Sequence, residues 1–160
     1  MPYEPYRNYG QANRRPMAQP SRPAPQPAPQ MIVRPMPIPA EYVDEAERVI
    51  KTLAAAGNGR IRLTTSKLRS FLTLVTDIYN RESLRTEPEL KQENQLKLMR
   101  LRVRIVYDAG RDPDVKRFVE EAHLLEYIKG IGKSREKMID FAHYMEALVA
   151  YHRFLGGKEN

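Results

Sequence analysis

Apolar residues recur at helical spacing from residue 41 onward. In the stretch 41–56 they form one stripe, and Gly57 and Gly59, which follow, can adopt the positive φ that ends helices. The stripe consists of Val43, Ala46, Val49, Ile50 and Leu53. The pattern therefore predicts an amphipathic helix over 41–56 with one face in a core.

Three further helices are predicted from their caps and apolar stripes. One begins at Thr64 or Thr65, whose hydroxyl can accept a hydrogen bond from a first-turn N–H group. Another is capped by Asp112 with Pro113 in its first position, and the last is capped by Ser134. Their stripes are Leu68, Phe71, Leu72, Val75 and Tyr79, then Val115, Phe118, Val119 and Ala122, then Met138, Phe141, Ala142, Met145, Leu148, Val149 and His152.

A fifth helix is predicted from about Pro88 to Ala109, and it carries two apolar stripes. At 100° per residue the stripes are Leu96, Met99, Val103, Val106 and Tyr107 on one side and Leu98, Leu101 and Ile105 on another. Because apolar residues on two sides indicate packing on two sides, we expect this helix to be central. Five helices with short links and no strand pattern predict an all-α bundle over 41–158.

Cationic side chains lie in a gap between these two stripes. They are Lys97, Arg100 and Arg104, joined by Arg111 if the helix extends that far. The spacing predicts an exposed basic ridge, and a solvated cationic face without a ligand is the alternative interpretation.

A second group of cations precedes or opens the helix that begins at residue 64 or 65. It consists of Arg60, Arg62, Lys67 and Arg69. Cations there oppose the partial positive charge of a helix N-terminus, typically by a few tenths of a kcal/mol each. An anionic partner would offset this cost if the group and the ridge faced one groove.

The composition changes near residue 40. Eleven of the 13 prolines lie in residues 1–40, together with five arginines and one glutamate. Because proline rings exclude both helix and sheet hydrogen bonding, we expect 1–40 to be a disordered Pro/Arg-rich tail, either solubilising or in contact with RNA or a protein.

Net charge and residue composition limit the kinds of binding partner and the cellular compartment to be expected. The chain carries a formal charge of +7, which favours an anionic partner, and it has no cysteine, which suits a reducing cytosol. No run of 18 apolar residues and no export signal occur, so we expect a cytoplasmic protein without a membrane partner.

The segment "YIKGIGKSREK", residues 127–137, carries an apolar-Gly-apolar-Gly turn with Lys129, Lys133 and Arg135 nearby. Such a turn resembles a helix-hairpin-helix element, whose backbone N–H groups hold a phosphate. A tight interhelical turn without a ligand is the alternative. "GKS" is not a phosphate-binding P-loop, because Tyr127 stands where that motif requires glycine.

No catalytic constellation is found. His123, His143 and His152 have no metal-ligand spacing, and His152 lies on an apolar stripe as a core histidine would. The carboxylates lie among lysines and arginines on polar faces. We therefore expect a protein that is not an enzyme and that uses no metal or cofactor.

Three segments together resemble a known family. "LTTSKLRSFL", "LKLMRLRVRIVYDAGRDPDVKRFVEEA" and "FAHYMEALVAYHRFLGG" are similar, in order and spacing, to the small all-helical subunit of type III-A CRISPR–Cas effector complexes, the Csm small subunit. The resemblance covers residues 41–157 and includes no role for 1–40. It implies a non-catalytic subunit, present in several copies as a filament beside the crRNA-binding backbone subunits, that lines the path of the target RNA. It also implies that RNA cutting, DNase and cyclic-oligoadenylate activities belong to other subunits.

Three functions follow as hypotheses. The first is a structural subunit that contacts target RNA, or also guide RNA, through backbone phosphates and without sequence readout. The second is a stand-alone nucleic-acid-binding domain that uses the Gly-Ile-Gly turn, and the third is a protein-interaction adaptor. Tyr79 and Tyr107 are candidates to stack on bases, although both lie on stripes assigned to the core.

Overall fold

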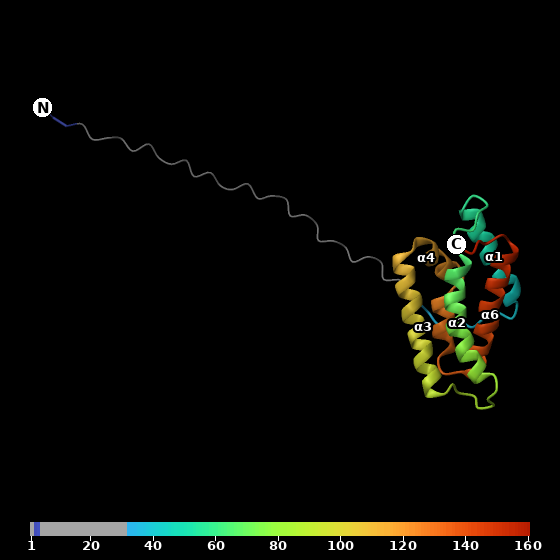
Figure 1. Cartoon of the computed structure of the whole chain (residues 1–160). Helices are drawn as coiled ribbons and strands as arrows, with labels where there is room; N and C mark the ends of the chain where they lie inside the picture. The colour runs from blue at the N-terminus through green and yellow to red at the C-terminus, as the bar shows by residue number, and fades with distance from the viewer. Residues whose placement is uncertain (1, 4–31) are drawn as a thin grey trace. The chain divides into compact units, whose positions relative to one another are not determined.

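The computed structural model of the chain describes residues 2–3 and 32–160. These residues form six helices (Figure 1). These are α1 (Tyr42–Ala56), α2 (Thr65–Glu82), α3 (Gln92–Arg111), α4 (Pro113–Glu121), α5 (Leu124–Ile131) and α6 (Arg135–Phe154). The described residues contain no strand beyond one isolated bridge between Glu89 and Ser134. The predicted all-α class is confirmed.

Three helix starts follow the predicted caps. The Thr64 hydroxyl accepts from Lys67 N–H at 3.4 Å, and the Ser134 hydroxyl accepts from Lys137 N–H at 3.3 Å. The Asp112 carboxylate accepts from Asp114 N–H at 2.9 Å, and Pro113 occupies the first position of α4. Each cap satisfies N–H groups that would otherwise lack an intrahelical partner.

Helix α5 was not predicted from the sequence, which indicated no helix between Ala122 and Ser134. The chain breaks between α4 and α5 at His123, whose φ of 51° lies in the left-handed region. Histidine adopts a positive φ less readily than glycine. The sequence also has no glycine or proline at this position, so the end of α4 could not be predicted from it. The third helix also begins at Gln92, four residues after Pro88, because residues 83–91 form the link from α2.

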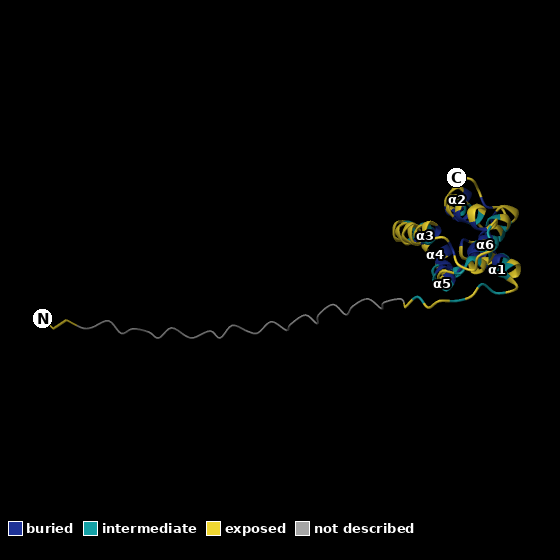
Figure 2. Cartoon of the chain, turned by 90° about the horizontal axis from the view of Figure 1, so that it is seen from below, coloured by how far each residue is buried: buried dark blue, intermediate teal, exposed yellow. Residues whose placement is uncertain are grey.

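Helix α6 is the central helix of the bundle. It packs against α1, α2 and α5, and its buried residues occupy several sides. Helix α3 packs mainly on α4 and α2 and also contacts α5, and its outer side is exposed at the edge of the bundle (Figure 2). The prediction of a central α3 is therefore wrong: of its two stripes, the one with Leu98, Leu101 and Ile105 is buried and the other is exposed.

An extended segment before α1 contacts the bundle. Met36 N–H donates to the carbonyl oxygen of Glu126 at 3.0 Å, and Lys129 Nζ donates to that of Val33 at 2.8 Å. A Cβ at Gly130 would lie 2.0 Å from Met36 O, so the glycine permits this approach. The expected tail falls largely on residues 4–31, outside the described residues, whereas 33–38 lie against α5.

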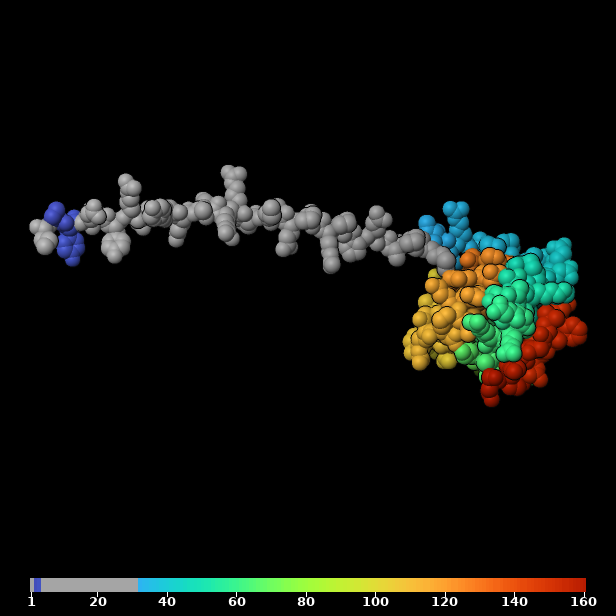
Figure 3. Space-filling model, turned by 90° about the horizontal axis from the view of Figure 1, so that it is seen from above, coloured from blue at the N-terminus to red at the C-terminus, as the bar shows by residue number. Residues whose placement is uncertain are grey.

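The C-terminal residues return to the start of α2. The carbonyl oxygens of Lys158 and Glu159 accept from the N–H groups of Thr65 and Ser66 at 2.8 and 3.4 Å. In Figure 3 the red C-terminal end accordingly lies beside the green start of α2. Among the described residues, no helix combines the length and apolarity that a membrane crossing requires.

Candidate nucleic-acid interface

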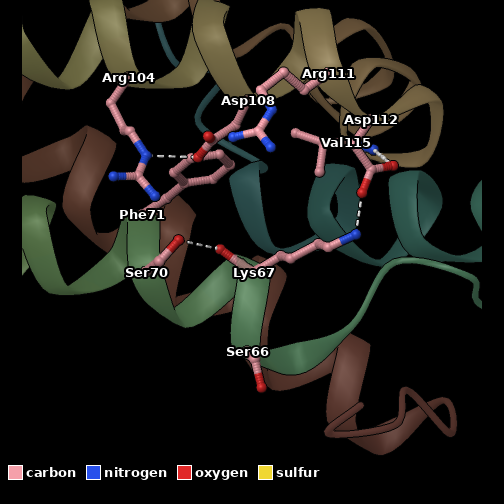
Figure 4. Close-up of a pocket in the computed structure, with 9 residues that line it drawn as sticks. All are labelled: Ser66, Lys67, Ser70, Phe71, Arg104, Asp108, Arg111, Asp112 and Val115. Carbon is pink, nitrogen blue, oxygen red and sulfur yellow. Dashed lines mark hydrogen bonds and ion pairs between the residues drawn. The ribbon is translucent and has the colours of Figure 1, made fainter.

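A surface cleft opens where α2, α3 and α4 meet, and its cavity volume is about 440 Å³ (Figure 4). The residues that line it are Ser66, Lys67, Ser70, Phe71, Arg104, Asp108, Arg111, Asp112 and Val115. The cleft brings one predicted cation of the α2 start, Lys67, together with two of the predicted α3 ridge, Arg104 and Arg111.

Lys67 forms an ion pair with Asp112, the residue that caps α4. The hydrogen bond from Lys67 lowers the pKa of Asp112, assisted by the N–H groups of Asp114 and Val115, while burial opposes the shift. Lys67 is 44% exposed and Asp112 is 24% exposed, so the pair is open to solvent. Such a pair contributes at most about 1 kcal/mol.

Two of the four cations at the α2 start, Lys67 and Arg69, have carboxylate partners within the chain, whereas for Arg60 and Arg62 the balance by a partner molecule stays a prediction. Asp112 and Glu159, both within the chain, lie against Lys67 and Arg69, the second pair at 3.6 Å. The carbonyls of residues 158 and 159 and the Thr64 hydroxyl also occupy the first N–H groups of α2. The α2 N-terminus therefore has no open N–H groups for an anion.

Arg104 and Arg111 lie on the α3 side of the cleft. Arg104 Nε donates to Asp108 at 2.7 Å, and this hydrogen bond raises the pKa of the guanidinium. Arg111 forms no ion pair with the described carboxylates. Its guanidinium lies 5.3 Å from the ring centre of Tyr107 and donates to the Tyr107 hydroxyl at 3.2 Å.

The other cations of the ridge and of the α2 start lie outside this cleft. Lys97 pairs with Asp77 at 2.6 Å. Arg100 is exposed, one helical turn before Arg104, and forms no ion pair with a described residue. Arg60 and Arg62 line a separate hollow beside the C-terminal segment.

The Gly-Ile-Gly segment has a structural role. Arg135 N–H donates to Pro88 O at 2.9 Å, and Lys137 N–H is taken by the Ser134 cap. The Arg135 guanidinium donates to the carbonyl oxygens of Glu82 and Glu87 at 3.1 and 2.7 Å. These contacts join the start of α6 to the link between α2 and α3, as expected for an interhelical turn, whereas the helix-hairpin-helix interpretation stays a prediction.

The cations of this segment are likewise placed away from the cleft. Lys129 is hydrogen-bonded to Val33, and Lys133 is exposed beside the link from α2 to α3. That link follows the end of α2 at Glu82, whereas the cleft lies at its start. The structure thus separates Lys129, Lys133 and Arg135 from the cleft residues.

Exposure changes the interpretation of the two tyrosines. Tyr107 is 56% exposed, contrary to its assignment to the core, because its stripe faces outward. Tyr79 is partly buried, with its ring 5.6 Å from that of His143. The sequence pattern placed Tyr107 on one of two apolar stripes of the helix. It could not show which of the two stripes is buried by neighbouring helices.

Histidine and carboxylate groups give no sign of a metal centre in the described part of the chain. Within residues 2–3 and 32–160, no three His, Asp or Glu side chains gather in a way that could hold a metal ion. His152 is fully buried and hydrogen-bonded, as predicted for a core histidine.

The fold and the cleft define a small all-helical protein whose candidate site is built from cations. Residues 40–158 match the family Csm2 Type III-A. The chain therefore belongs to the Csm2 family of type III-A CRISPR systems, and its resemblance to the Csm small subunit is confirmed.

Curated relatives agree over the same region. The chain is 45% identical to "CRISPR system Cms protein Csm2" of Streptococcus thermophilus over 118 residues, which are 74% of this chain and 93% of that protein. It is 42% identical over 119 residues to the protein of that name from Mycobacterium tuberculosis H37Rv, covering 74% and 94%. The Enterococcus italicus protein is 35% identical over 94 residues, covering 58% and 67%.

Proposed function

We propose that this chain is a non-catalytic structural subunit of a type III-A CRISPR interference complex. Several copies form a filament along the target RNA, and each copy contacts the RNA backbone without reading its sequence. Family membership supports the subunit role. The RNA contact is supported by the cleft between α2, α3 and α4.

One observation carries the proposed RNA contact. Lys67 on α2 and Arg104 and Arg111 on α3 line the same exposed cleft. Asp112, which follows Arg111, is 45 residues from Lys67 in the sequence, so the fold brings these cations together. Arg111 has no carboxylate partner among the described residues, so its guanidinium is available to a phosphate. Phosphate contacts of this kind position a strand and carry no sequence information.

The charge of the cleft predicts weak binding by a single copy. Three cations and two carboxylates, Asp108 and Asp112, leave a net charge of 3 − 2 = +1. A phosphate must therefore compete with Asp112 for Lys67 and with Asp108 for Arg104. Several copies on one strand would compensate for this weakness, because each later contact is made at high effective concentration.

The test replaces Lys67, Arg104 or Arg111 by alanine in the assembled complex, with Lys116→Ala as the matched control. Lys116 is also an exposed cation, but it lies on α4 outside the cleft lining. We expect each cleft variant to weaken binding about two- to fivefold, the loss of roughly 0.5–1 kcal/mol, and equally for two unrelated RNAs. The slope of log affinity against log salt is negative, and its magnitude should decrease by about 0.7 per lost phosphate contact.

Unchanged affinity and slope in all three cleft variants would refute the RNA role of the cleft, as would an equal effect of Lys116→Ala. A loss confined to one RNA sequence would indicate base readout instead. The non-catalytic part of the proposal is tested separately. A nuclease activity that survives purification and disappears with a single substitution in this chain would contradict it.

A further inference from the structure

Helix α3 presents a continuous apolar stripe to solvent. Leu96, Met99, Val103 and Val106 are 46, 59, 68 and 50% exposed. Their spacing of three, four and three residues is that of a coiled-coil seam, which Gly110 would continue four residues later. At 1.5 Å per residue, positions 96 to 106 cover about 15 Å of helix surface.

This stripe is separate from the packing of α3 within the chain. The residues that α3 buries are Asn94, Leu98, Leu101 and Ile105, and they lie on the opposite side of the helix. Single exposed apolar residues are ordinary, but four in one register over three turns form a patch of the kind that marks protein interaction sites.

The polar borders of the stripe are cationic. Arg100 lies along one border and Arg102 along the other, and neither forms an ion pair with a described residue. No carboxylate stands at a border position between Gln95 and Ala109. A helix that packs on such a seam is favoured when it places Glu or Asp along its own borders.

These borders select among occupants. A second copy packed stripe to stripe would bring four guanidiniums into one heptad with no carboxylate beside them. RNA would meet aliphatic side chains, whereas nucleic-acid bases stack on aromatic rings. Tyr107 is the one aromatic residue beside the described seam, and its ring already contacts Arg111.

We propose that the outer face of α3, defined by Leu96, Met99, Val103 and Val106 with Arg100 and Arg102, is the docking site for an amphipathic helix of a different polypeptide. That helix carries apolar residues at three- and four-residue spacing and carboxylates along both borders. The proposal does not depend on the RNA contact of the cleft.

The test places a photo-crosslinking amino acid, p-benzoylphenylalanine, at Val103 or at Met99 of the full chain in the assembled complex. Sequencing of the crosslinked peptide should identify a segment of another polypeptide with apolar residues in helical register and Asp or Glu at the borders. A crosslink to a second copy of this chain, to RNA, or to a segment without border carboxylates would overturn the proposal. So would the absence of a crosslink at both positions.

Charge reversal supplies the second arm. Arg100→Glu with Arg102→Glu should lower the crosslink yield at Val103 at least fivefold, whereas Lys116→Glu should leave it unchanged. Because the substituted side chains are exposed, we expect the variants to fold normally. An unchanged melting temperature checks this. Lys67→Ala and Arg111→Ala should leave the yield unchanged even if they weaken RNA binding, which separates this proposal from the RNA role. Equal yields in the charge-reversed and control proteins would refute the role of the borders.

Discussion

The ring of His152 joins the end of α6 to the residue before the cap of α2, because its Nε2 donates to the carbonyl oxygen of Leu63 at 2.6 Å. A carbonyl accepts only from a protonated nitrogen, so the neutral ring carries its proton on Nε2. Nδ1 is then the acceptor for the Thr65 hydroxyl at 3.3 Å. The buried histidine thus links two segments that are 89 residues apart.

Acidification should destabilise the protein through His152. Burial lowers the pKa of this histidine below 6.5, with a further lowering by Arg153, while the Leu63 hydrogen bond and Glu159 oppose the shift. The unfolded chain therefore binds the proton more readily, and stability that is complete above about pH 6.5 is lost as the pH falls toward the folded pKa. The loss is at most about 1.4 kcal/mol per pH unit.

Urea unfolding at pH 7.5 and pH 5.5 checks this prediction in the wild type and in His152→Gln. The amide can still donate and accept, so we expect a loss of about 1–3 kcal/mol at pH 7.5 but a smaller further loss at pH 5.5. Equal pH dependence in both proteins would assign the effect to other groups.

Gly157→Ala should destabilise the closure of the C-terminal segment. A Cβ at this position would lie 2.1 Å from Cε1 of His152 and 2.6 Å from its carbonyl oxygen. We expect a loss of about 1–3 kcal/mol in the free energy of unfolding, as for other overpacked sites. Gly110→Ala is the control, because no atom lies within 4 Å of its added Cβ and it is a helical position. It should be neutral or stabilise by up to about 1 kcal/mol.

The extended segment at 33–38 should stabilise the bundle. A chain that starts at residue 32 keeps the Met36–Glu126 and Lys129–Val33 hydrogen bonds, whereas a chain that starts at residue 40 loses both. Two net hydrogen bonds predict a loss of about 1–3 kcal/mol, or at least about 4 °C in melting temperature.

Gly130→Ala makes the same test by a double-mutant cycle. In the chain from residue 32 the new methyl group would displace Met36 and should destabilise. In the chain from residue 40 the same substitution should be neutral or stabilising, because alanine favours helix. Additive effects would show that the segment and Gly130 do not interact.

Asp112 should restrain the cleft as well as cap α4. Asp112→Asn keeps a capping oxygen and removes the charge beside Lys67, so stability should fall less than in Asp112→Ala, which loses the cap and about 1 kcal/mol. The cleft charge then rises from +1 to +2. If Lys67 contacts RNA phosphates as proposed, Asp112→Asn should bind RNA about two- to fivefold more tightly at low salt in the assembled complex.

An unchanged or weaker RNA affinity in Asp112→Asn would indicate that Lys67 serves only the ion pair. Asp114→Asn, on the same turn of α4 but outside the cleft lining, is the matched control and should leave the affinity unchanged.

Local chemistry in the sequence was sufficient for the helix starts and for most of the core. The caps at Thr64, Asp112 and Ser134 act within three residues. Of the five residues in the single predicted stripe of α1, four are buried, and Val43 in the first turn is exposed. The core position of His152 followed from the same periodicity. The family, too, could be recognised from the sequence segments alone.

Tertiary structure decided everything that depends on which distant segments meet. The sequence shows that α3 has two apolar faces. Which of them is buried depends on the packing of α2, α4 and α5 against it. The partner of Lys67 is 45 residues away, and Gly130 is required by a carbonyl oxygen of Met36. Periodicity records the direction of a side chain about its own helix, whereas burial and ion pairing are set by the neighbours that the fold brings to it.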